Sequence, residues 1–273
     1  MNKMQELKLA DGNKIPQVGL GLWQLTDQAK FKASFNAAIA AGYRHFDTAQ
    51  AYHNEQLLGD AIKESGVKRQ DLFITTKIAV QNFGEKKSRT SFMQSLKRLD
   101  MEYVDLVLLH FPIPLLRKKT WAVVEGLKAE SLTKSIGVSN FTINHLKQLE
   151  GYAKELPVVN QVEMHLFLQQ DRLLDYCQSK NIIIEAYSPL AHAKAMDNEV
   201  IGLMAVKYKH SYAQIMLRWA IQKGVVVIPK SANPKRVVEN IDVMDFEISD
   251  EDMTSLTKLN KNLHTCWNPE LVP

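Results

Sequence analysis

The sequence predicts an α/β protein built as an eight-stranded (β/α)8 barrel. Short apolar runs rich in β-branched residues alternate with longer segments of helical periodicity, as expected for parallel strands joined by helices. The polar residues that end successive runs would gather on one rim of such a barrel. The length of 273 residues is also close to the roughly 250 typical of this fold, which often forms one domain.

The apolar runs give eight strands, and helical periodicity fills most of the segments between them. The predicted strands are Val18–Leu22, Arg44–Asp47, Leu72–Lys77, Val104–His110, Ser135–Val138, Val158–Val162, Ile182–Tyr187 and Val225–Ile228. The predicted helices are Gln28–Ala41, Glu55–Glu64, Lys86–Leu99, Thr120–Leu127, Ile143–Tyr152 and Gln170–Ser179, with a further helix opening at Asn233-Pro234. Asn54 is expected to cap the second of these helices.

The first segment and one glycine-rich stretch bear on the topology. Leu7–Ile15, centred on Asp11-Gly12-Asn13, predicts a β-hairpin across the bottom of the barrel. An open, doubly wound sheet would also alternate strands and helices. However, the glycines of Gly19–Gln24 lack the third glycine and the turn into a helix that a dinucleotide-binding fingerprint needs.

Composition indicates an ordinary globular protein without a nucleic-acid or membrane partner. Hydrophobic residues make up 45% and charged residues 23%, with a net charge of +4. The densest basic run, Arg117–Lys119, is expected to be a solvated face. Cys177 and Cys266 are too few for a disulfide framework, Met1–Leu9 lacks a signal-peptide core, and no apolar run approaches ~20 residues. We therefore expect a cytoplasmic monomer.

Ionisable and polar residues recur where the predicted strands end. They are Asp47, Lys77, His110, Ser139, Asn140, Gln161, Tyr187, Lys230 and Ser231. Taken singly, Asp47 and Lys77 are also explained as an ion pair, and His110 as a core histidine. Together they are better explained by a site, because the carboxyl ends of barrel strands meet on one rim.

The side-chain types on this rim suit reduction of a carbonyl. Tyr52, five residues after Asp47, is the natural proton donor. A buried Lys77 cation would lower the tyrosine pKa from its ordinary value near 10, and Asp47 would keep that lysine charged. A histidine can orient the substrate oxygen.

Seven blocks in chain order resemble the aldo-keto reductase superfamily, and within it the bacterial 2,5-diketo-D-gluconate and methylglyoxal reductases. The blocks are GYRHFDTAQAY (Gly42–Tyr52), ITTK (Ile74–Lys77), DLVLLHFP (Asp105–Pro112), IGVSNF (Ile136–Phe141), NQ (Asn160–Gln161), AYSPL (Ala186–Leu190) and IPKS (Ile228–Ser231) followed by Arg236, Glu239 and Asn240. The resemblance runs from about residue 7 to 260 and implies one aldo-keto reductase barrel domain over residues 1–273.

The resemblance implies an NADPH-dependent reductase of aldehydes and ketones, acting on small carbonyls or keto-sugar acids. It implies a catalytic tetrad of Asp47, Tyr52, Lys77 and His110. It implies that the nicotinamide is held by Ser139, Asn140, Gln161 and Tyr187, with Ser188 and Leu190 adjoining, and that Lys230, Ser231 and Arg236 bind the 2′-phosphate, with Glu239 and Asn240 near the adenine. The substrate pocket would be lined by Trp23, Ala79, Phe111 and Trp267.

Two positions depart from the family pattern. Ala79 and Phe111 stand where relatives usually carry tryptophan, and the segment between Pro112 and Trp121 looks short. These differences bear on substrate choice.

Two other functions remain open. The alternatives are a class I aldolase with a Schiff base on Lys77, or a nicotinamide-binding regulatory subunit without turnover. A metal-dependent hydrolase is disfavoured, because no H-x-H motif follows the first strand and the histidines do not cluster.

Overall fold

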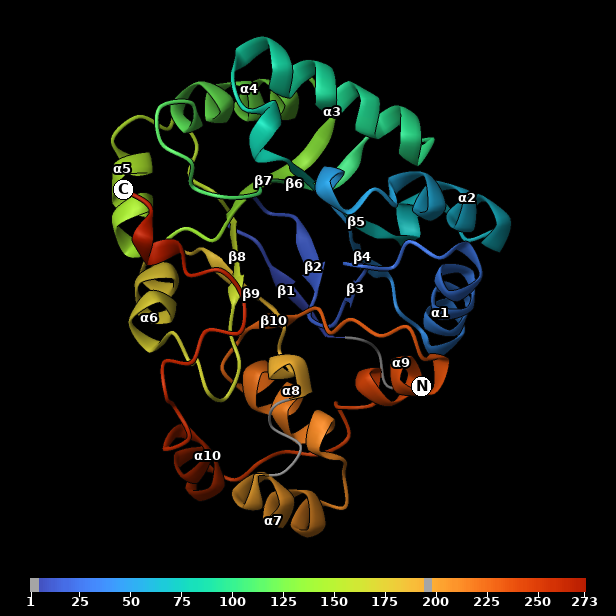
Figure 1. Ribbon diagram of the computed structural model, residues 1–273, viewed down its shortest axis with the longest axis vertical. Helices are drawn as coiled ribbons and strands as arrows, with labels where there is room; N and C mark the ends of the chain where they lie inside the picture. Colours follow the sequence, from blue (N-terminus) through green and yellow to red (C-terminus); the bar gives the residue numbers. More distant parts are fainter. Residues whose placement is uncertain (1–4, 194–197) are drawn as a thin grey trace.

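Eight parallel strands form the barrel predicted from the sequence, and they follow one another around it in chain order (Figure 1). The computed structural model describes residues 5–193 and 198–273. The first four residues of the Met1–Leu9 stretch, in which no signal peptide was expected, lie outside this part. The strands are β3 (Leu20–Gly21), β4 (His45–Asp47), β5 (Phe73–Ile78), β6 (Val104–Leu109), β7 (Thr133–Ser139), β8 (Val159–Glu163), β9 (Ile183–Tyr187) and β10 (Val226–Val227).

The cylinder closes between its last and first strands. The Gly19 amide donates to the Val227 carbonyl at 2.9 Å, and the Val227 amide donates to the Gln17 carbonyl at 2.9 Å. A parallel bridge also pairs Gly21 with Lys230. Residues on both sides of the seam therefore reach the same rim.

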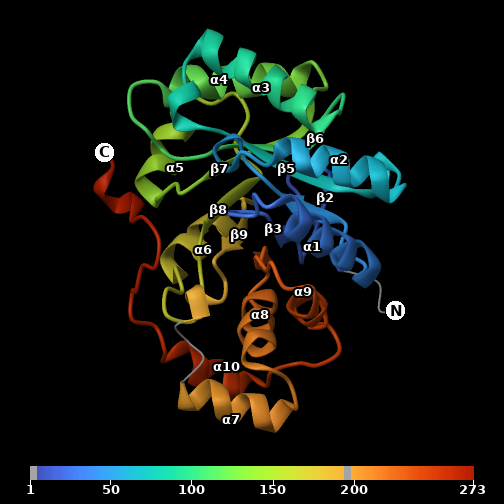
Figure 2. The ribbon, with the colours of Figure 1, turned by 45° about the vertical axis from the view of Figure 1, so that its right-hand side comes forward.

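Helices pack around the outside of the barrel (Figures 1 and 2). They are α1 (Gln28–Ala41), α2 (Glu55–Ser65), α3 (Glu85–Leu99), α4 (Arg117–Ala129), α5 (Ile143–Glu150), α6 (Asp171–Ser179), α7 (Glu199–Tyr208), α8 (Tyr212–Gln222), α9 (Pro234–Ile241) and α10 (Asp250–Thr257). Short 3-10 turns are η1 (Gln50–Tyr52), η2 (Arg69–Asp71), η3 (Val80–Asn82), η4 (Ala191–Ala193) and η5 (Pro269–Leu271). The sequence analysis identified α1 to α6 and α9, but it did not delimit α7, α8 and α10.

Among the described residues, side-chain caps start α1, α5, α7, α8, α9 and α10, whereas α2, α3, α4 and α6 begin without one. The Asn233 side chain accepts a hydrogen bond from the Lys235 amide at the start of α9, as expected. Asn54 stands before α2, but its side chain makes no capping bond. It instead donates to the carbonyls of Leu22 and Leu25 and accepts from Thr48. The prediction that Asn54 caps α2 is therefore wrong. Its side-chain amide is instead used by the carbonyls of Leu22 and Leu25.

The N-terminal hairpin closes the bottom of the barrel. Strands β1 (Glu6–Lys8) and β2 (Lys14–Pro16) pair antiparallel, with Leu7 opposite Ile15, as the sequence predicted. Ile15 is fully buried and belongs to a small apolar cluster with residues of β6, β8 and β10. The hairpin is thus anchored to the barrel strands by apolar contacts.

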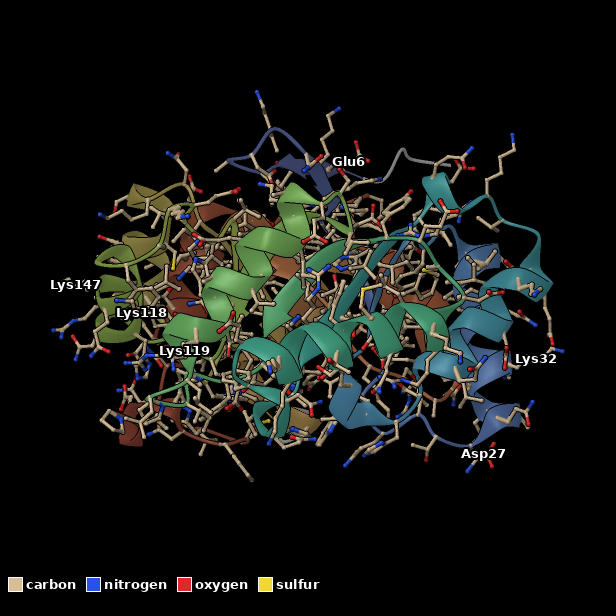
Figure 3. All side chains as sticks on the ribbon, turned by 90° about the horizontal axis from the view of Figure 1, so that it is seen from above. Glu6, Asp27, Lys32, Lys118, Lys119 and Lys147 are labelled. Carbon is tan, nitrogen blue, oxygen red and sulfur yellow. The ribbon has the colours of Figure 1, made fainter. Side chains whose placement is uncertain are left out.

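Charged side chains lie mainly on the outside, where Glu6 on the hairpin and Asp27 mark opposite ends of the barrel (Figure 3). Lys118 and Lys119 project outward, but Arg117 is buried. Its guanidinium donates to the carbonyls of Pro112 and Pro273 and to Gln148. The expectation of a solvated face is thus wrong for Arg117, which holds the C-terminal end of the chain. Within the described residues, no helix is both long and apolar enough to cross a membrane.

Candidate active site

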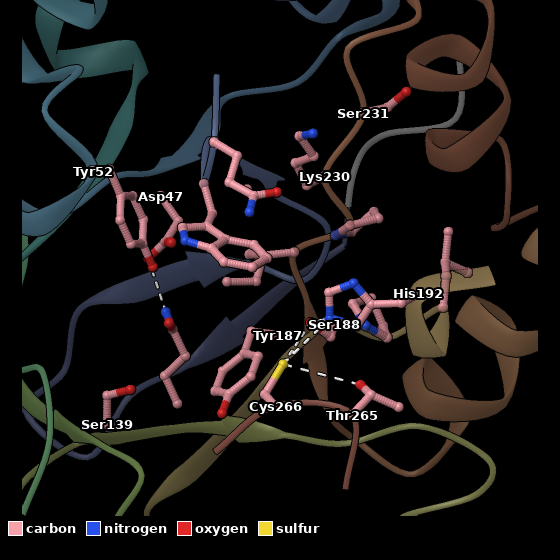
Figure 4. A pocket seen from close by; sticks show the side chains of 18 of the residues that line it. Asp47, Tyr52, Ser139, Tyr187, Ser188, His192, Lys230, Ser231, Thr265 and Cys266 are labelled. Atoms are coloured by element: carbon pink, nitrogen blue, oxygen red, sulfur yellow. Dashed lines mark hydrogen bonds between the residues drawn. The ribbon is translucent and has the colours of Figure 1, made fainter. Parts of the chain in front are cut away.

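A cavity of about 1400 Å3 opens at the carboxyl ends of the strands and runs from Trp23 to Asn240. This exceeds the ~300–1,000 Å3 of most small-ligand pockets, which leaves room for a dinucleotide and a substrate together. Every residue that the sequence analysis assigned to a site lines this cavity, except Lys77. Figure 4 shows Tyr52 and Asp47 on one side and Lys230 and Ser231 further along.

Lys77 lies just behind the cavity wall, with no exposed surface, and organises the reactive group. Its ammonium Nζ donates to Asp47 Oδ1 at 2.6 Å, to the Thr48 carbonyl at 3.0 Å and to Tyr52 Oη at 3.1 Å. An ammonium has three N–H donors, so each of them has an acceptor. Burial opposes the charge, but Asp47 and Tyr52 together outweigh it, and the pKa of Lys77 is raised above its ordinary value. This direction favours the ammonium form of Lys77.

Tyr52 is held in place by three buried side chains of its own loop. Thr48 Oγ1 donates to Asn54 Oδ1 at 2.6 Å, which fixes the loop between β4 and α2. Gln50 Oε1 accepts from the Ala79 amide at 3.0 Å and from Asn82 Nδ2 at 2.8 Å. The loop that carries Tyr52 is thus fastened to the segment after β5, the strand that supplies Lys77.

Burial and Lys77 act on the acidity of Tyr52 in opposite directions. Burial raises the pKa of Tyr52, and Lys77 lowers it by less, so the net pKa lies above the ordinary value. The expected direction of the Lys77 effect is thus confirmed, but burial, which removes the hydration of the phenolate, has the larger effect on the pKa of Tyr52.

His110 is a neutral imidazole in this site. Burial and the nearby Lys77 charge lower the pKa of His110 to about 3. Its ring meets the Tyr52 ring edge-on, with centroids 5.6 Å apart. At neutral pH it can donate a hydrogen bond to a substrate oxygen, but it holds no extra proton to give away.

The middle of the cavity presents amides and a tyrosine suited to a carboxamide and a flat ring. Asn140 Oδ1 accepts from Tyr187 Oη at 2.8 Å, and Asn140 Nδ2 donates to Ser139 Oγ at 3.0 Å. Gln161 Nε2 donates to Asp47 Oδ2 at 2.8 Å and to Glu185 Oε2 at 2.6 Å. Both Gln161 donors are thereby used, which leaves its carbonyl oxygen as the acceptor for a nicotinamide amide. The residues present fit this group.

The far end of the cavity is polar and basic. Lys230 and Arg236 are exposed, while Ser231 is buried with its hydroxyl bonded to the Asn233 amide and carbonyl. They surround the start of α9, whose first N–H groups favour an anion. A phosphate group fits this arrangement.

The mouth of the cavity is aromatic on the tail side and open beside β5. Trp23 is 42% and Trp267 81% exposed, and the Trp267 ring meets Phe111 edge-on at 6.2 Å. Ala79 lines the cavity with its small methyl group. Phe83, four residues further along the chain, packs into the core and does not line the cavity.

The sequence analysis missed the residues that hold the C-terminal tail against this mouth. Glu163, at the end of β8, accepts hydrogen bonds from the Thr265 amide at 2.7 Å, from its hydroxyl, and from the Cys266 amide at 3.2 Å. Cys266 lies near Ser188 and His192 (Figure 4). A glutamate inside an apolar strand and a tail one hundred residues away share no sequence pattern that would have revealed this contact.

The fold and this set of side chains define a class of protein: barrel oxidoreductases that interconvert carbonyls and alcohols with a nicotinamide cofactor. Comparison with known proteins agrees. The model of the Aldo/keto reductase family matches residues 17–261, and the chain belongs to this family.

Named relatives cover nearly the whole chain. The chain is 44% identical to the glyoxal reductase of Bacillus subtilis over 264 residues, which is 97% of this chain and 96% of the relative. It is 41% identical to the methylglyoxal reductase DkgA of Escherichia coli over 268 residues, 97% of this chain and 96% of the relative. An aldo-keto reductase of Bombyx mori solved in complex with NADP superposes with a TM-score of 0.92 at 34% identity, covering 97% of this chain and 95% of that one.

Proposed function

We propose that this protein reduces aldehydes and ketones to alcohols, with NADPH as the hydride source and Tyr52 as the proton donor. The observation that carries the proposal is the Lys77 ammonium, which lies 3.1 Å from the Tyr52 hydroxyl and 2.6 Å from Asp47 at one end of a dinucleotide-sized cavity. The named relatives support the reaction class, since two of them are reductases of glyoxal and methylglyoxal.

In this mechanism each residue of the tetrad has a separate task. NADPH supplies a hydride to the carbonyl carbon, and the Tyr52 hydroxyl gives its proton to the carbonyl oxygen. The phenolate left on Tyr52 faces the Lys77 cation, whose charge Asp47 balances. His110, neutral with a pKa of about 3, donates a hydrogen bond that holds the substrate oxygen beside Tyr52.

The environment of Lys77 disfavours the aldolase alternative. A Schiff-base lysine has to lose its proton to attack a carbonyl, and it usually does so in a pocket without a carboxylate partner. Asp47 lies 2.6 Å from Nζ and raises the pKa of Lys77. Borohydride should therefore trap no substrate adduct on this lysine.

Replacing Tyr52 with phenylalanine tests the proton donor. The Tyr52→Phe variant should lose ~10²-fold or more in kcat, the usual scale for a missing general acid. Cofactor binding, followed by quenching of tryptophan fluorescence, should change little. Tyr176→Phe is the matched control, because the Tyr176 hydroxyl bonds Glu150 away from the cavity. Near-normal turnover in Tyr52→Phe would move the acid role elsewhere, and no turnover of any carbonyl by the wild type would favour a regulatory subunit.

Arg236 tests the preference for the phosphorylated cofactor. A charge-assisted hydrogen bond contributes roughly 1.5–3 kcal/mol, so Arg236→Ala should weaken NADPH binding about tenfold or more and NADH binding far less. Lys235→Ala is the control, since Lys235 is an exposed cation next in the chain that does not line the cavity. Equal losses for both cofactors would mean that Arg236 does not contact the 2′-phosphate.

A further inference from the structure

A continuous set of buried polar contacts leads from Tyr52 down into the barrel. Lys77 joins the Tyr52 hydroxyl to Asp47, and Gln161 joins Asp47 to Glu185 through its two N–H groups. Glu185, in the middle of β9, is fully buried and is not used by the mechanism above. Its Oε2 accepts from Gln161, whereas its Oε1 makes no hydrogen bond with correct geometry among the described residues.

The imidazole of His45 lies directly against this second oxygen. His45 Nε2 is 3.3 Å from Glu185 Oε1 and 3.3 Å from Thr75 Oγ1, and both the His45 and Glu185 side chains are fully buried. Gly19 leaves the room for this ring, because a Cβ at position 19 would lie 2.6 Å from His45 Nδ1.

The other ring nitrogen fixes the protonation of this contact. His45 Nδ1 lies 3.3 Å from the Pro16 carbonyl, which can only accept, so Nδ1 carries a hydrogen. In a neutral His45 ring Nε2 is then an acceptor. An ionised Glu185 would place the lone pairs of Oε1 against the lone pair of Nε2, which is repulsive. Thr75 can turn its hydroxyl, but Glu185 can satisfy Nε2 only by carrying a proton or by receiving one from a doubly protonated ring.

We propose that His45 and Glu185 hold one proton between them and act as a positioning pair that keeps the floor of the active site electrically balanced beneath Tyr52. With that proton in place the pair is neutral, and the charges of Lys77 and Asp47 cancel. Loss of the proton adds one negative charge to the group that is hydrogen-bonded to Asp47 through Gln161.

The surrounding charges support this assignment. The charged groups that face Glu185 are Asp47 on β4 and Lys77 on β5, with neutral Gln161 on β8 and His45 on β4. Burial and the Asp47 charge raise the pKa of Glu185 to about 8. Burial, with Lys77 adding to it, lowers the pKa of His45 to about 3. At neutral pH the proton therefore resides mainly on Glu185.

The pair has a direct consequence for Tyr52. An ionised Glu185 raises the pKa of Tyr52, as does Asp47, and so makes the hydroxyl a weaker acid. Reduction should then decline as the pH rises through the value at which the pair loses its proton. This consequence rests on the proposed role of Tyr52, whereas the shared proton itself does not.

Infrared spectroscopy in heavy water tests the shared proton without turnover. The wild type at neutral pH should show the C=O stretching band of a protonated carboxylic acid, and this band should be missing in Glu185→Gln. The band should persist in the matched variant Glu163→Gln. This variant removes a carboxylate on the neighbouring strand that is also buried but is ionised at neutral pH. Titration should abolish the wild-type band near pH 8. A wild type without the band, or a band that survives in Glu185→Gln, overturns the proposal.

The pH profile of carbonyl reduction tests the link to Tyr52. In Glu185→Gln the decline of kcat at the pH where the wild-type pair loses its proton should disappear, because a glutamine cannot gain the negative charge, while KM at neutral pH stays close to that of the wild type. Glu163→Gln should keep the wild-type inflection. An unshifted decline in Glu185→Gln overturns the role of the pair, and it does so even if Tyr52→Phe is inactive as expected.

A misfolded Glu185→Gln variant would not end the test. In the wild type alone, the loss of the infrared band and the decline of kcat must then fall at the same pH. A decline that occurs while the band remains overturns the proposal.

Discussion

Glu163 and Glu185 are glutamates on neighbouring strands, and both are buried, yet they hold protons in opposite ways. Although burial pulls it upward, the pKa of Glu163 falls to about 2 because His165, the Thr265 amide and hydroxyl, and the Cys266 amide all donate to its carboxylate. The pKa of Glu185 rises to about 8 because burial and Asp47 face a carboxylate with one donor, Gln161. Hydrogen-bond donors outweigh burial at Glu163, whereas burial and the Asp47 charge outweigh the single donor at Glu185.

The two glutamates accordingly serve different parts of the molecule. Glu163 is at the rim, where an ionised carboxylate fastens the tail that carries Trp267 over the cavity. Glu185 is in the barrel interior, where a second ionised carboxylate beside Asp47 would unbalance the Lys77 site. Glu163 thus holds the C-terminal tail at the mouth of the cavity. Glu185, according to the proposal above, affects the acidity of Tyr52 from below.

The largest expected effect is on the pH dependence of stability in Glu185→Gln. A raised pKa means that the folded state keeps a proton that the unfolded chain loses above about pH 4.3. The stabilisation is complete below that value and is lost as the pH rises to about 8. The wild-type free energy of unfolding should therefore lose up to about 1.4 kcal/mol per pH unit relative to Glu185→Gln across this window, a few kcal/mol in all.

Urea unfolding at a series of pH values checks this effect. Glu163→Gln should keep the wild-type slope in the same window, because its carboxylate is ionised in both the folded and the unfolded chain there. Parallel curves for Glu185→Gln and the wild type would show that Glu185 is ionised when folded, and the contrast between the two glutamates would disappear.

The second prediction concerns the tail and the opposite end of the pH scale. A lowered pKa gives stabilisation that is complete above about pH 4.3 and is lost as the pH falls toward about 2. In Glu163→Gln the amides of Thr265 and Cys266 lose a charged acceptor, typically worth roughly 1.5–3 kcal/mol. Their hydrogen exchange at neutral pH should accelerate ~10- to 100-fold.

The same tail supplies an internal control for this exchange experiment. The amides of Lys261 and Leu263 donate to the Phe167 carbonyl instead of a carboxylate. They should be much less affected in Glu163→Gln and unaffected in Glu185→Gln. If the Thr265 and Cys266 amides keep their protection from hydrogen exchange in Glu163→Gln, other contacts hold the tail and Glu163 is not needed for it.

The rim could be predicted from the sequence, whereas neither glutamate could. Strand ends such as Asp47 and His110 stand out because an ionisable residue follows an apolar run, and barrel topology then brings them together. Glu185 lies inside a strand that otherwise looks like core, and Glu163, the last residue of β8, directly follows the predicted strand Val158–Val162 but was overlooked. Their charge depends on donors such as Thr265 and Gln161, which are distant in the sequence.

The fold shows the same division between local pattern and distant partners. Helix α1 was predicted with its observed bounds, because it has one buried and one exposed face. Helix α8 was not delimited from the sequence, although its polar residues Gln214, Arg218 and Gln222 recur every four residues between residues that are mostly buried. Arg117 was misjudged because its acceptors include the carbonyl of Pro273, at the far end of the chain.

The smallest expected effect is at Ala79, which lines the cavity with only a methyl group. The Ala79 amide is fixed by Gln50, and Phe83 packs elsewhere, so an indole at position 79 should fill space beside Trp267. A buried aromatic side chain covers ~150–250 Å2, enough to narrow the pocket for bulky substrates and to add contacts for small ones. Ala79→Trp should therefore shift the kcat/KM ratio of methylglyoxal to a bulky aryl aldehyde by ~3- to 10-fold toward methylglyoxal, with cofactor affinity unchanged. We expect the new indole to pack against the tail that Glu163 holds. The shift in the kcat/KM ratio should therefore be smaller in the double variant with Glu163→Gln and unchanged in the double variant with Glu185→Gln. Steady-state kinetics of the single and double variants measure this ratio. An equal shift in all of them would show that the tail held by Glu163 does not line the substrate pocket.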